Sequence, residues 1–330
     1  MKTPARLGLY GGGLALAFAG AFAAANLTVP ESAVEAWNES TEDEEMDHGG
    51  TDTAHAADSI RGLVAEQDGY QLVELTAPDE VGTDGELEFE INAPGGEPLT
   101  EYAVSHDKEL HLIVVRTDGA EFRHVHPVRD EDGTWSLPWT WEAAGTYRVY
   151  ADFAPAADED LDVTLTSTVD VSGDFAVQAA EPSPTAEVDG FEVALDGDLS
   201  AGSTSTLTFA VTRDGEPVTE IEPYLGAFGH LVALREGDLA YLHVHPEGDE
   251  PSAGQESGPE IVFAAEAPTE GRYLLYLDFQ VDGQVRTAAF VVDTAAAAPE
   301  TAPENQDEDT EESADETDGG HESDGHGHGH

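Results

Sequence analysis

Short segments in which apolar and polar residues alternate run through residues 67–172, and Gly, Pro and Asp residues separate them. A period of two residues is typical of a β-strand that buries one face and exposes the other. The segments expected to form strands are 70–76, 86–92, 110–116, 121–126, 134–141, 146–153 and 162–171. Seven short strands in about a hundred residues favour an immunoglobulin-like β-sandwich.

The pattern returns in the second half of the chain as an internal repeat. Residues 96–127 align with 215–246 at a constant offset of 119, without a gap. Farther along the offset is 126, so that 145–153 aligns with 271–279 and the second copy carries a seven-residue insertion before this strand. Repetition over this length indicates two copies of one domain.

We therefore predict an all-β fold with two tandem immunoglobulin-like β-sandwich domains, at 67–172 and 187–294, joined by a linker at 173–186. In each copy a Gly-X-Tyr triplet opens a strand, with Tyr147 in the first copy and Tyr273 in the second. The triplets resemble the tyrosine corner of such sandwiches, in which the tyrosine hydroxyl bonds to the backbone a few residues upstream. The pattern leaves that backbone partner open.

The chain outside the two domains predicts export and disorder. Residues 1–29 carry Lys2 and Arg6 before a run without charges, as in a signal peptide or an N-terminal membrane anchor. The protein is then secreted or anchored to the outer face of the cytoplasmic membrane, and only this segment meets the membrane. Residues 30–66 form an acidic linker and residues 295–330 an acidic, histidine-rich tail, and both compositions are typical of disorder.

The charge balance of the chain is strongly acidic. Asp and Glu number 70 against 12 Lys and Arg, which gives a formal net charge of −58. Nucleic acid is excluded as a partner, because the sequence has no basic patch to neutralise phosphates. The chain has no cysteine, so any metal site must use imidazole nitrogens and oxygens.

Histidines recur at identical spacing in the two copies. The six positions are His111, His124 and His126 in the first copy and His230, His243 and His245 in the second. In the first copy a hairpin turn at Asp118–Gly119 places His111 opposite His126. The same register places His124 opposite Ile113. Side chains of such pairs share a face, with Cβ atoms about 4.5–5.5 Å apart, so the three imidazoles are expected to converge.

A turn at Gly237–Asp238 predicts the same convergence in the second copy. Each patch suits a divalent transition metal, because neutral imidazoles bind such ions and a His-X-His pair on a rigid strand is preorganised to chelate. The general affinity series favours copper over zinc or nickel. Water or a carboxylate is left for the fourth position. Asp152 and Asp278 are the nearest carboxylates, but alternation along their strands turns them away from the expected core face. The two patches form a single site if the domains face each other.

The histidine face has a structural interpretation as well. It also carries Ile113, Val115 and Phe122, and we therefore expect it to be the interior of the sandwich. Histidines at the end of a core are often satisfied by backbone carbonyls and bind nothing. Their density argues against this, because three imidazoles on one small patch are costly to bury without a shared ion or proton. His106 and Lys108 occur only in the first copy and are interpreted as surface features.

Two motifs in the second copy carry a family resemblance. Tyr-Leu-Gly-Ala-Phe-Gly-His at 224–230 and His-Val-His-Pro at 243–246 resemble prokaryotic secreted or membrane-tethered proteins that are labelled uncharacterised or heavy-metal-binding. The resemblance extends over most of both repeats and implies metal binding outside the cytoplasm. More loosely, the predicted domain is similar to periplasmic copper carriers of the CopC type. Their N-terminal histidine and methionine-rich loop have no counterpart in this chain, so their copper geometry is not carried over.

These features predict an exported metal-binding protein, not an enzyme, that sequesters copper or hands it to a membrane metal transporter or another exported metal protein. The alternating Gly-His residues of the tail would add weak binding of Ni, Cu or Zn. The alternative is a cell-surface structural or adhesion protein whose histidines are structural. A remote alternative is a copper-dependent enzyme, because the His-Val-His strand is similar to that of copper–zinc superoxide dismutase. The zinc-loop histidines and the disulfide of that enzyme are absent here.

Overall fold

The computed structural model describes residues 61–179, 181–242, 244–248, 250–252 and 254–294. Within these ranges every regular element is a β-strand, as predicted. The described part of the chain accordingly holds no helix long and apolar enough to cross a membrane. The expected signal or anchor, most of the acidic linker and the whole of the tail lie outside the described residues.

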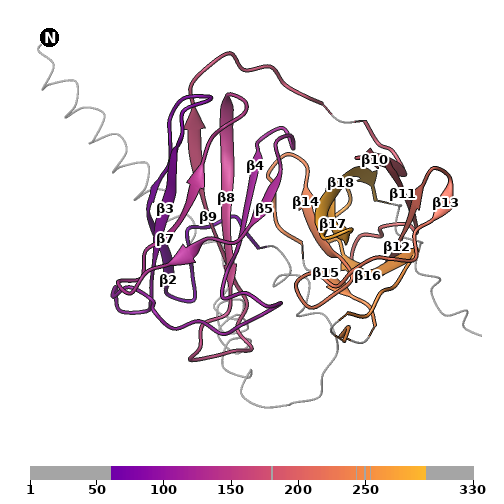
Figure 1. Ribbon diagram of the computed structural model, residues 1–330. Coiled ribbons are helices and arrows are strands. Elements are labelled where there is room, and N and C mark those ends of the chain that lie inside the picture. The colour runs from indigo at the N-terminus through magenta and orange to yellow at the C-terminus, as the bar shows by residue number, and fades with distance from the viewer. Residues whose placement is uncertain (1–60, 180, 243, 249, 253, 295–330) are drawn as a thin grey trace, which may run out of the picture. The chain divides into compact units, whose positions relative to one another are not determined.

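Two antiparallel sheets make up the first domain (Figure 1). One sheet has the strand order β1-β2-β3-β7-β6 and the other the order β5-β4-β8-β9. The strands are β1 (Glu66–Gln67), β2 (Tyr70–Thr76), β3 (Gly85–Asn92), β4 (His111–Arg116), β5 (Arg123–Val125), β6 (Val128–Arg129), β7 (Trp135–Trp139), β8 (Gly145–Phe153) and β9 (Val163–Val171). All seven predicted strands are present, and β1 and β6 are short additions.

Alternate residues of these strands fill the space between the two sheets. Leu87 on β3 and Val149 on β8 are both 0% exposed, and they belong to one core cluster. Trp135, Trp139 and Trp141 pack into the same cluster. The tryptophan-rich segment therefore belongs to the core, and the burial of these large rings contributes to the hydrophobic stabilisation of the domain.

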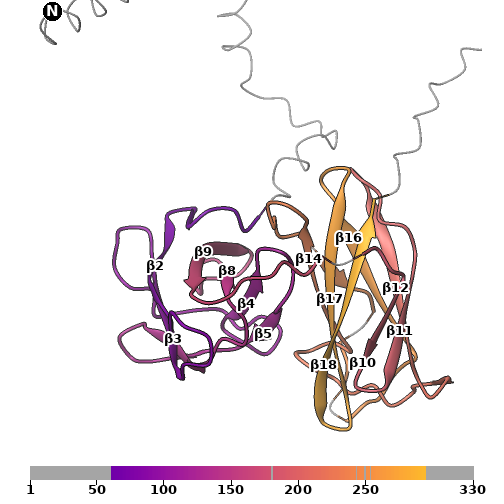
Figure 2. The same ribbon diagram turned by 90° about the horizontal axis from the view of Figure 1, so that it is seen from above.

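The second domain repeats this architecture. Its sheets have the orders β10-β11-β12-β16-β15, with β13 paired to β12, and β14-β17-β18, and they form the two layers seen in Figure 2. The strands are β10 (Thr185–Val188), β11 (Phe191–Asp196), β12 (Thr204–Arg213), β13 (Glu216–Pro217), β14 (His230–Arg235), β15 (Val244–Pro246), β16 (Glu260–Glu266), β17 (Arg272–Val281) and β18 (Gln284–Asp293). The prediction of two tandem immunoglobulin-like β-sandwiches is confirmed.

Both domains contain the tyrosine corner. The hydroxyl of Tyr147 donates to the carbonyl of Ala143 at 2.8 Å, and that of Tyr273 donates to the carbonyl of Thr269 at 2.8 Å. The backbone partner that the sequence left open therefore lies four residues upstream in each copy. This bond ties the start of β8 or β17 to the loop that precedes it.

Strand β4 is buried on both faces, and this corrects one expectation. Leu112 and Val114 face the core of their own domain. Ile113 and Val115 belong instead to a separate cluster that includes Leu234 of the second domain. The face that carries the histidines is therefore not the sandwich interior; it is the outer face of the β5-β4-β8-β9 sheet, and the second domain covers it.

Equivalent contacts from the two repeats join the domains at this face. The hydroxyl of Tyr150 on β8 donates to the carbonyl of Leu239 at 2.6 Å. The hydroxyl of Tyr276, its counterpart on β17, donates to the carbonyl of Gly119 at 2.6 Å. Each domain thus reaches the hairpin turn of the other. Phe122 stacks on the ring of Tyr276, with centroids 3.9 Å apart.

Candidate metal centre

The three histidines of the first repeat lie on the hairpin formed by β4 and β5. Its register pairs Ile113 with His124 and Leu112 with Val125, as the turn at Asp118–Gly119 predicts. His111 opens β4, His124 lies within β5, and His126 follows directly after β5. One nitrogen from each of these three rings lies within 4.8 Å of the others. The predicted convergence in this repeat is confirmed.

The ring nitrogens that converge are specific ones. Nδ1 of His111 lies 3.0 Å from Nε2 of His124 and 3.2 Å from Nε2 of His126. His124 and His126 of the His-X-His motif thus direct Nε2 into the cluster, whereas His111 on the neighbouring strand directs Nδ1 into it. Three nitrogens around one point form one face of a tetrahedral site, which is the arrangement that Zn²⁺ uses in catalytic and transport proteins.

The partners of the opposite ring nitrogens determine where the protons are. Nε2 of His111 lies 3.2 Å from the carbonyl oxygen of Ser105, which can only accept a hydrogen bond. Nδ1 of His124 lies 2.8 Å from Oδ2 of Asp278, and a carboxylate likewise accepts. Both nitrogens therefore carry the proton of their ring. When both rings are neutral, the facing nitrogens, Nδ1 of His111 and Nε2 of His124, are two lone pairs 3.0 Å apart.

Two lone pairs at this distance repel unless a cation lies between them. The N–H of His126 can be donated to His111, but that bond does not relieve the contact between His111 and His124. Both rings are also largely buried, because the side chain of His124 is 3% exposed and His111 is 8% exposed. Unpaired acceptors in such surroundings cost free energy.

Burial keeps His111 and His126 neutral. Desolvation, followed by the neighbouring His124, lowers the pKa of His111 to about 2. Burial is also the largest cause that lowers the pKa of His126 to about 3, followed by His124. Desolvation disfavours the protonated form. At neutral pH these imidazoles are therefore available as metal ligands.

The placement of Asp152 and Asp278 corrects a second expectation. Asp152 pairs with His111 across β4 and β8, and Asp278 pairs with His230 across β14 and β17. Each aspartate shares a face with a histidine, because the histidines lie on the outer face of the sheet and not on the core face. Asp278 contacts His124, whereas Asp152 accepts a bond from Thr164 at 2.7 Å. Burial raises the pKa of Asp152 to about 6.

The second repeat does not reproduce the hairpin of the first within the described residues. The bond from the amide of Leu242 to the carbonyl of Ala233 still joins the turn to β14. Strand β15 then pairs with β16 of the opposite sheet, and His245 is exposed on it. His243 lies outside the described residues. The convergence of three histidines expected for this copy is therefore not found in the described part of the chain. The reason is that β15 pairs with β16, whereas β5 of the first copy pairs with β4.

His230 joins the site of the first repeat. Its ring centroid lies 6.0 Å from those of His111 and His124. Its Nε2 donates to the carbonyl of Leu225 at 2.9 Å, which leaves Nδ1 as a lone pair, as in His111. Burial lowers the pKa of His230 to about 4. The structure therefore matches the expectation of one patch shared by facing domains better than the expectation of two separate triads.

His106 was interpreted from the sequence as a surface feature, and it is exposed, but it also lies at the edge of the site and lines its cavity. Its ring centroid lies 4.9 Å from that of His230, and desolvation lowers its pKa. The residue has a φ of 49°, and the next, Asp107, a φ of 62°, so a left-handed turn brings the imidazole into the site. Alternation gives no signal for a loop of this kind. The repeat alignment could not reveal His106 either, because the second copy has no histidine at the equivalent position.

A cavity of about 190 Å³ adjoins the cluster. The histidines among its lining residues are His106, His111, His124, His230 and His245. Arg61 also lines it, and this guanidinium is paired with Asp162 at 3.2 Å. The cavity is large enough for several water molecules or a small ligand. Among the described residues, these five histidines border this one cavity.

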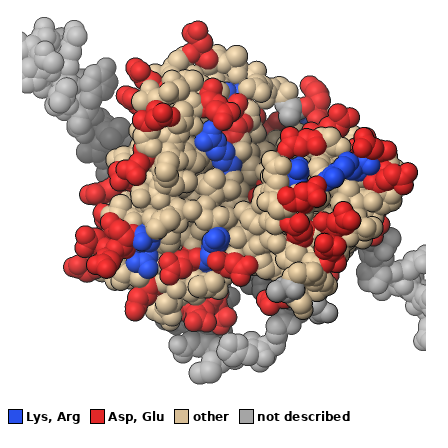
Figure 3. Space-filling view, in the orientation of Figure 1, with Lys and Arg blue, Asp and Glu red and all other residues tan. Residues whose placement is uncertain are grey.

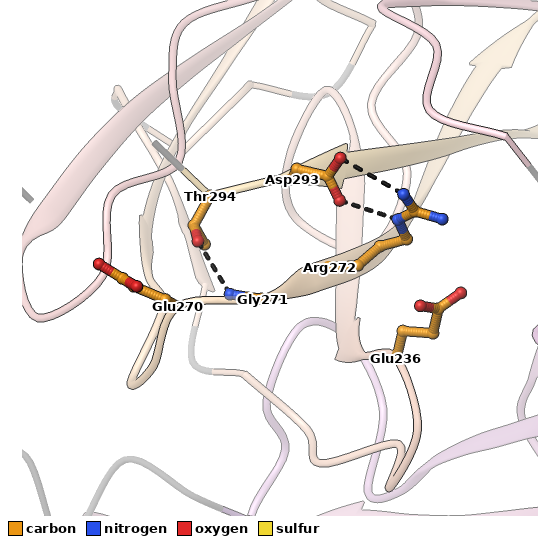
Figure 4. A pocket seen from close by; sticks show the side chains of 6 residues that line it. All are labelled: Glu236, Glu270, Gly271, Arg272, Asp293 and Thr294. Carbon is orange, nitrogen blue, oxygen red and sulfur yellow. Dashed lines mark hydrogen bonds and ion pairs between the residues drawn. The ribbon is translucent and has the colours of Figure 1, made fainter. Parts of the chain in front are cut away.

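A second depression lies at the start of β17 and offers different chemistry (Figure 4). Its guanidinium, from Arg272, is bound to the carboxylate of Asp293 at 2.8 Å. The other charged residues that line it, Glu236 and Glu270, are acidic. An exposed ion pair with two further carboxylates carries no imidazole and no buried unpaired donor. This depression is not a candidate site.

Acidic side chains are spread over the surface of the protein. Figure 3 shows many Asp and Glu residues and few Lys and Arg residues on the face in view. This distribution agrees with 70 acidic and 12 basic residues in the sequence. A negative potential of this kind raises the local concentration of cations.

The sequence model of a protein family described as Domain of unknown function (DUF8832) matches the chain twice, at 65–173 and 186–296. The chain belongs to this family. Each match coincides with one of the two sandwiches, so the DUF8832 domain is the immunoglobulin-like unit of the repeat. The triad of the first DUF8832 domain and Asp278 of the second meet at the face between the two copies.

No curated protein matches the DUF8832 chain significantly. Among solved structures, it is similar to a mutant of Salmonella alpha-2-macroglobulin, with 16% identity, a TM-score of 0.25, and coverage of 72% of this chain and 15% of that one. It is also similar to the bacterial integrin-binding protein invasin, with 13% identity, a TM-score of 0.21, and coverage of 69% and 39%. Domains 4 and 5 of the S-layer protein SbsC give 12% identity, a TM-score of 0.21, and coverage of 69% and 98%. Similarities this low carry no functional argument.

Proposed function

We propose that this protein binds a divalent transition metal through His111, His124 and His126. The observation that carries the proposal is the pair of facing ring nitrogens of His111 and His124, 3.0 Å apart on largely buried side chains. Backbone and carboxylate partners hold the protons of both rings on the far side. A metal ion removes the repulsion and satisfies all three nitrogens at once.

Copper is the favoured ion. The donor set is imidazole, and the chain has no cysteine to select a soft ion. For such sites the general affinity series places Cu²⁺ above Zn²⁺ and Ni²⁺. The acidic surface raises the local concentration of any of these cations.

We propose further that the protein acts outside the cytoplasm and sequesters the ion or delivers it to a membrane transporter or another exported metal protein. The support is the charge pattern of residues 1–29, which is that of a signal or anchor. A site buried between two domains suits retention of an ion, because exchange requires movement of protein around it.

The competing function is that of a cell-surface β-sandwich protein with structural histidines. One observation favours it: His111, His124 and His230 each already bond a carbonyl or carboxylate of the protein. Histidines satisfied in this way help to fix the packing of a domain interface without an ion. The two functions differ in whether metal changes the stability of the protein.

Calorimetric titration of Cu²⁺ and Zn²⁺ into the full chain tests the proposal. The tail histidines are changed to Asn in every sample so that they do not compete; they are His321, His326, His328 and His330. We expect one ion per chain with micromolar affinity or better, and a loss of about 100-fold or more in a His124→Ala/His126→Ala variant.

The matched control is Arg272→Gln, which alters the acidic depression and leaves the triad intact. It should bind as the wild type does. Equal, weak binding by the wild type and the histidine variant, with both folded by circular dichroism, would instead assign the histidines to packing.

A further inference from the structure

The candidate centre is built from both DUF8832 domains, although its three converging nitrogens come from one. We propose that the bound ion holds the two domains together, an arrangement that we call the clasp. Asp278 of the second domain is then a positioning residue for the ligand His124. This inference rests on the proposed function and deepens it. Metal binding by the first domain and docking of the second are then one coupled equilibrium.

Asp278 is held firmly in place. It is 3% exposed, and its Oδ2 lies 2.8 Å from Nδ1 of His124. Its other oxygen, Oδ1, accepts a bond from the hydroxyl of Thr287 on β18 at 2.5 Å. Histidines that bind metals commonly donate their second N–H to a carboxylate, which fixes the tautomer and the ring orientation and strengthens the ligand. Here that carboxylate comes from the other domain.

The rest of the interface holds this contact in register. Tyr276 lies two residues before Asp278, on the same face of β17, and donates to the carbonyl of Gly119. Tyr150 makes the reciprocal bond to Leu239. Apolar residues from both domains, including Ile113 and Leu234, pack around these bonds in one cluster. The carboxylate therefore reaches His124 only when the domains are docked.

Docking without an ion has an electrostatic cost. In the neutral form of His124, the contact with Asp278 keeps the proton on Nδ1, so Nε2 faces the lone pair of the largely buried His111. An ion at this point converts the repulsion into two attractive contacts. The ion therefore stabilises the docked arrangement, and docking strengthens ion binding by the same factor, because the coupling of two binding equilibria is reciprocal.

The first domain supplies a matched control residue. Asp152 is the repeat counterpart of Asp278, lies on the same kind of strand, and is bonded to a threonine, Thr164. Its described hydrogen bonds do not include a triad nitrogen. Replacement of the partly buried Asp152 removes the carboxylate at the equivalent position of the first repeat while the contact between Asp278 and His124 remains.

The first arm of the test compares Asp278→Ala with Asp152→Ala in the full chain that carries the Asn substitutions in its tail. Affinity for Cu²⁺ and Zn²⁺ is measured by calorimetry, and the visible spectrum of the Co²⁺-loaded protein reports ligand geometry. We expect Asp278→Ala to bind tenfold to 100-fold more weakly with an altered Co²⁺ spectrum. Asp152→Ala should keep the affinity and the spectrum of the wild type.

The second arm needs no substitution at Asp278. Amide hydrogen exchange of the wild type is followed with and without Zn²⁺ at 238–242 and 274–279, which belong to the second domain and contain no triad ligand. We expect exchange to slow about tenfold or more at these segments when the ion binds. Strand β3, at 85–92 in the far sheet of the first domain, should be unchanged.

The outcomes separate the two proposals. Absence of binding by the wild type overturns the proposed function. If the wild type binds and Asp278→Ala binds equally tightly, the clasp is overturned while metal binding stands. Weaker binding without protection of the second domain also overturns the clasp, because coupling must act in both directions. If Asp278→Ala does not fold, the exchange result of the wild type decides alone.

Discussion

At the scale of single residues, the proposed chemistry depends on where three protons are held. Ser105 and Asp278 fix the protons of His111 and His124 by accepting from them. Leu225 does the same for His230. These partners come from loops and from the other domain, so each imidazole has one nitrogen bound to protein and one directed into the site. Such an arrangement is sensitive to pH.

The metal-free protein should lose stability as the pH falls from about 7 to about 4. The folded-state pKa values of His111, His126 and His230 are about 2, 3 and 4, whereas an unfolded histidine has a pKa of 6.5. Below 6.5 the unfolded state therefore binds protons that the folded state does not, and the free energy of unfolding decreases. Asp152, with its pKa raised to about 6, acts in the opposite direction but for one proton only.

Urea unfolding at pH 7, 6 and 5 in chelator and 1 M NaCl measures this slope. A His111→Gln variant isolates one histidine, and its slope should be flatter by up to about 1.4 kcal/mol per pH unit. Identical slopes for the variant and the wild type would mean that His111 takes up its proton in the folded state.

At the scale of elements, the two hairpin turns are where the domains meet. Gly119 has a φ of 84°, and a Cβ placed there would lie 2.6 Å from Cδ1 of Leu274. Gly237, in the hairpin of the second copy, has a φ of 101° and no heavy atom within 4 Å of such a Cβ. The two glycines share the left-handed backbone, but only Gly119 approaches the other domain.

Gly119→Ala should therefore destabilise the protein more than Gly237→Ala. Both substitutions incur the cost of a left-handed alanine, about 1 kcal/mol. Gly119→Ala adds a clash with Leu274, which we expect to bring the total loss to about 2–3 kcal/mol. Urea unfolding of the two variants measures the difference. Equal losses would mean that Leu274 moves aside without cost.

Much of this element structure is predictable from the sequence. The strands, the register of the first hairpin and the tyrosine corners follow from local alternation and turn chemistry. The prediction was wrong about which face of β4 lies in the sandwich interior. Leu112 and Val114 are as apolar as Ile113 and Val115, so alternation does not say which face meets the partner sheet. A continuous apolar run at 112–115 was the available signal that both faces are buried.

The other errors have physical reasons too. The change of β15 from β14 to β16 depends on competition between two sheets, which a local pattern does not record. The position of the exposed His106 beside the site was missed because it depends on a turn of two residues with positive φ. The contact between His124 and Asp278 spans 154 residues and requires the docking of two domains. Sequence periodicity predicts contacts within a hairpin well and contacts between domains poorly.

At the scale of the whole molecule, charge opposes compactness. A formal net charge of −58 places many carboxylates close together on a folded surface. The described ion pairs are mostly exposed and involve the few arginines, so they offset little of this repulsion. Salt at molar concentration shortens the screening length to about 3 Å and removes most of this repulsion between carboxylates.

The thermal midpoint of the protein should therefore rise with salt. Between 0.05 and 2 M NaCl we expect an increase of at least about 5 °C, because self-repulsion is greatest in the compact state. Differential scanning calorimetry at fixed pH measures it, with isosmotic sucrose as the control that does not screen charge. A midpoint that stays constant or falls with NaCl would show that the surface carboxylates are too well solvated to matter.

The reciprocal tyrosine bonds, from Tyr150 to Leu239 and from Tyr276 to Gly119, have a consequence for the history of the chain. Contacts in which each copy uses the same residue against the other are those of an isologous homodimer. A homodimer carries every feature twice, and a mutation in one copy alters both. Once the copies are joined in one polypeptide, equivalent residues can take different roles. Both copies carry the three histidines and the aspartate, but the described triad belongs to the first domain and the carboxylate bonded to it belongs to the second.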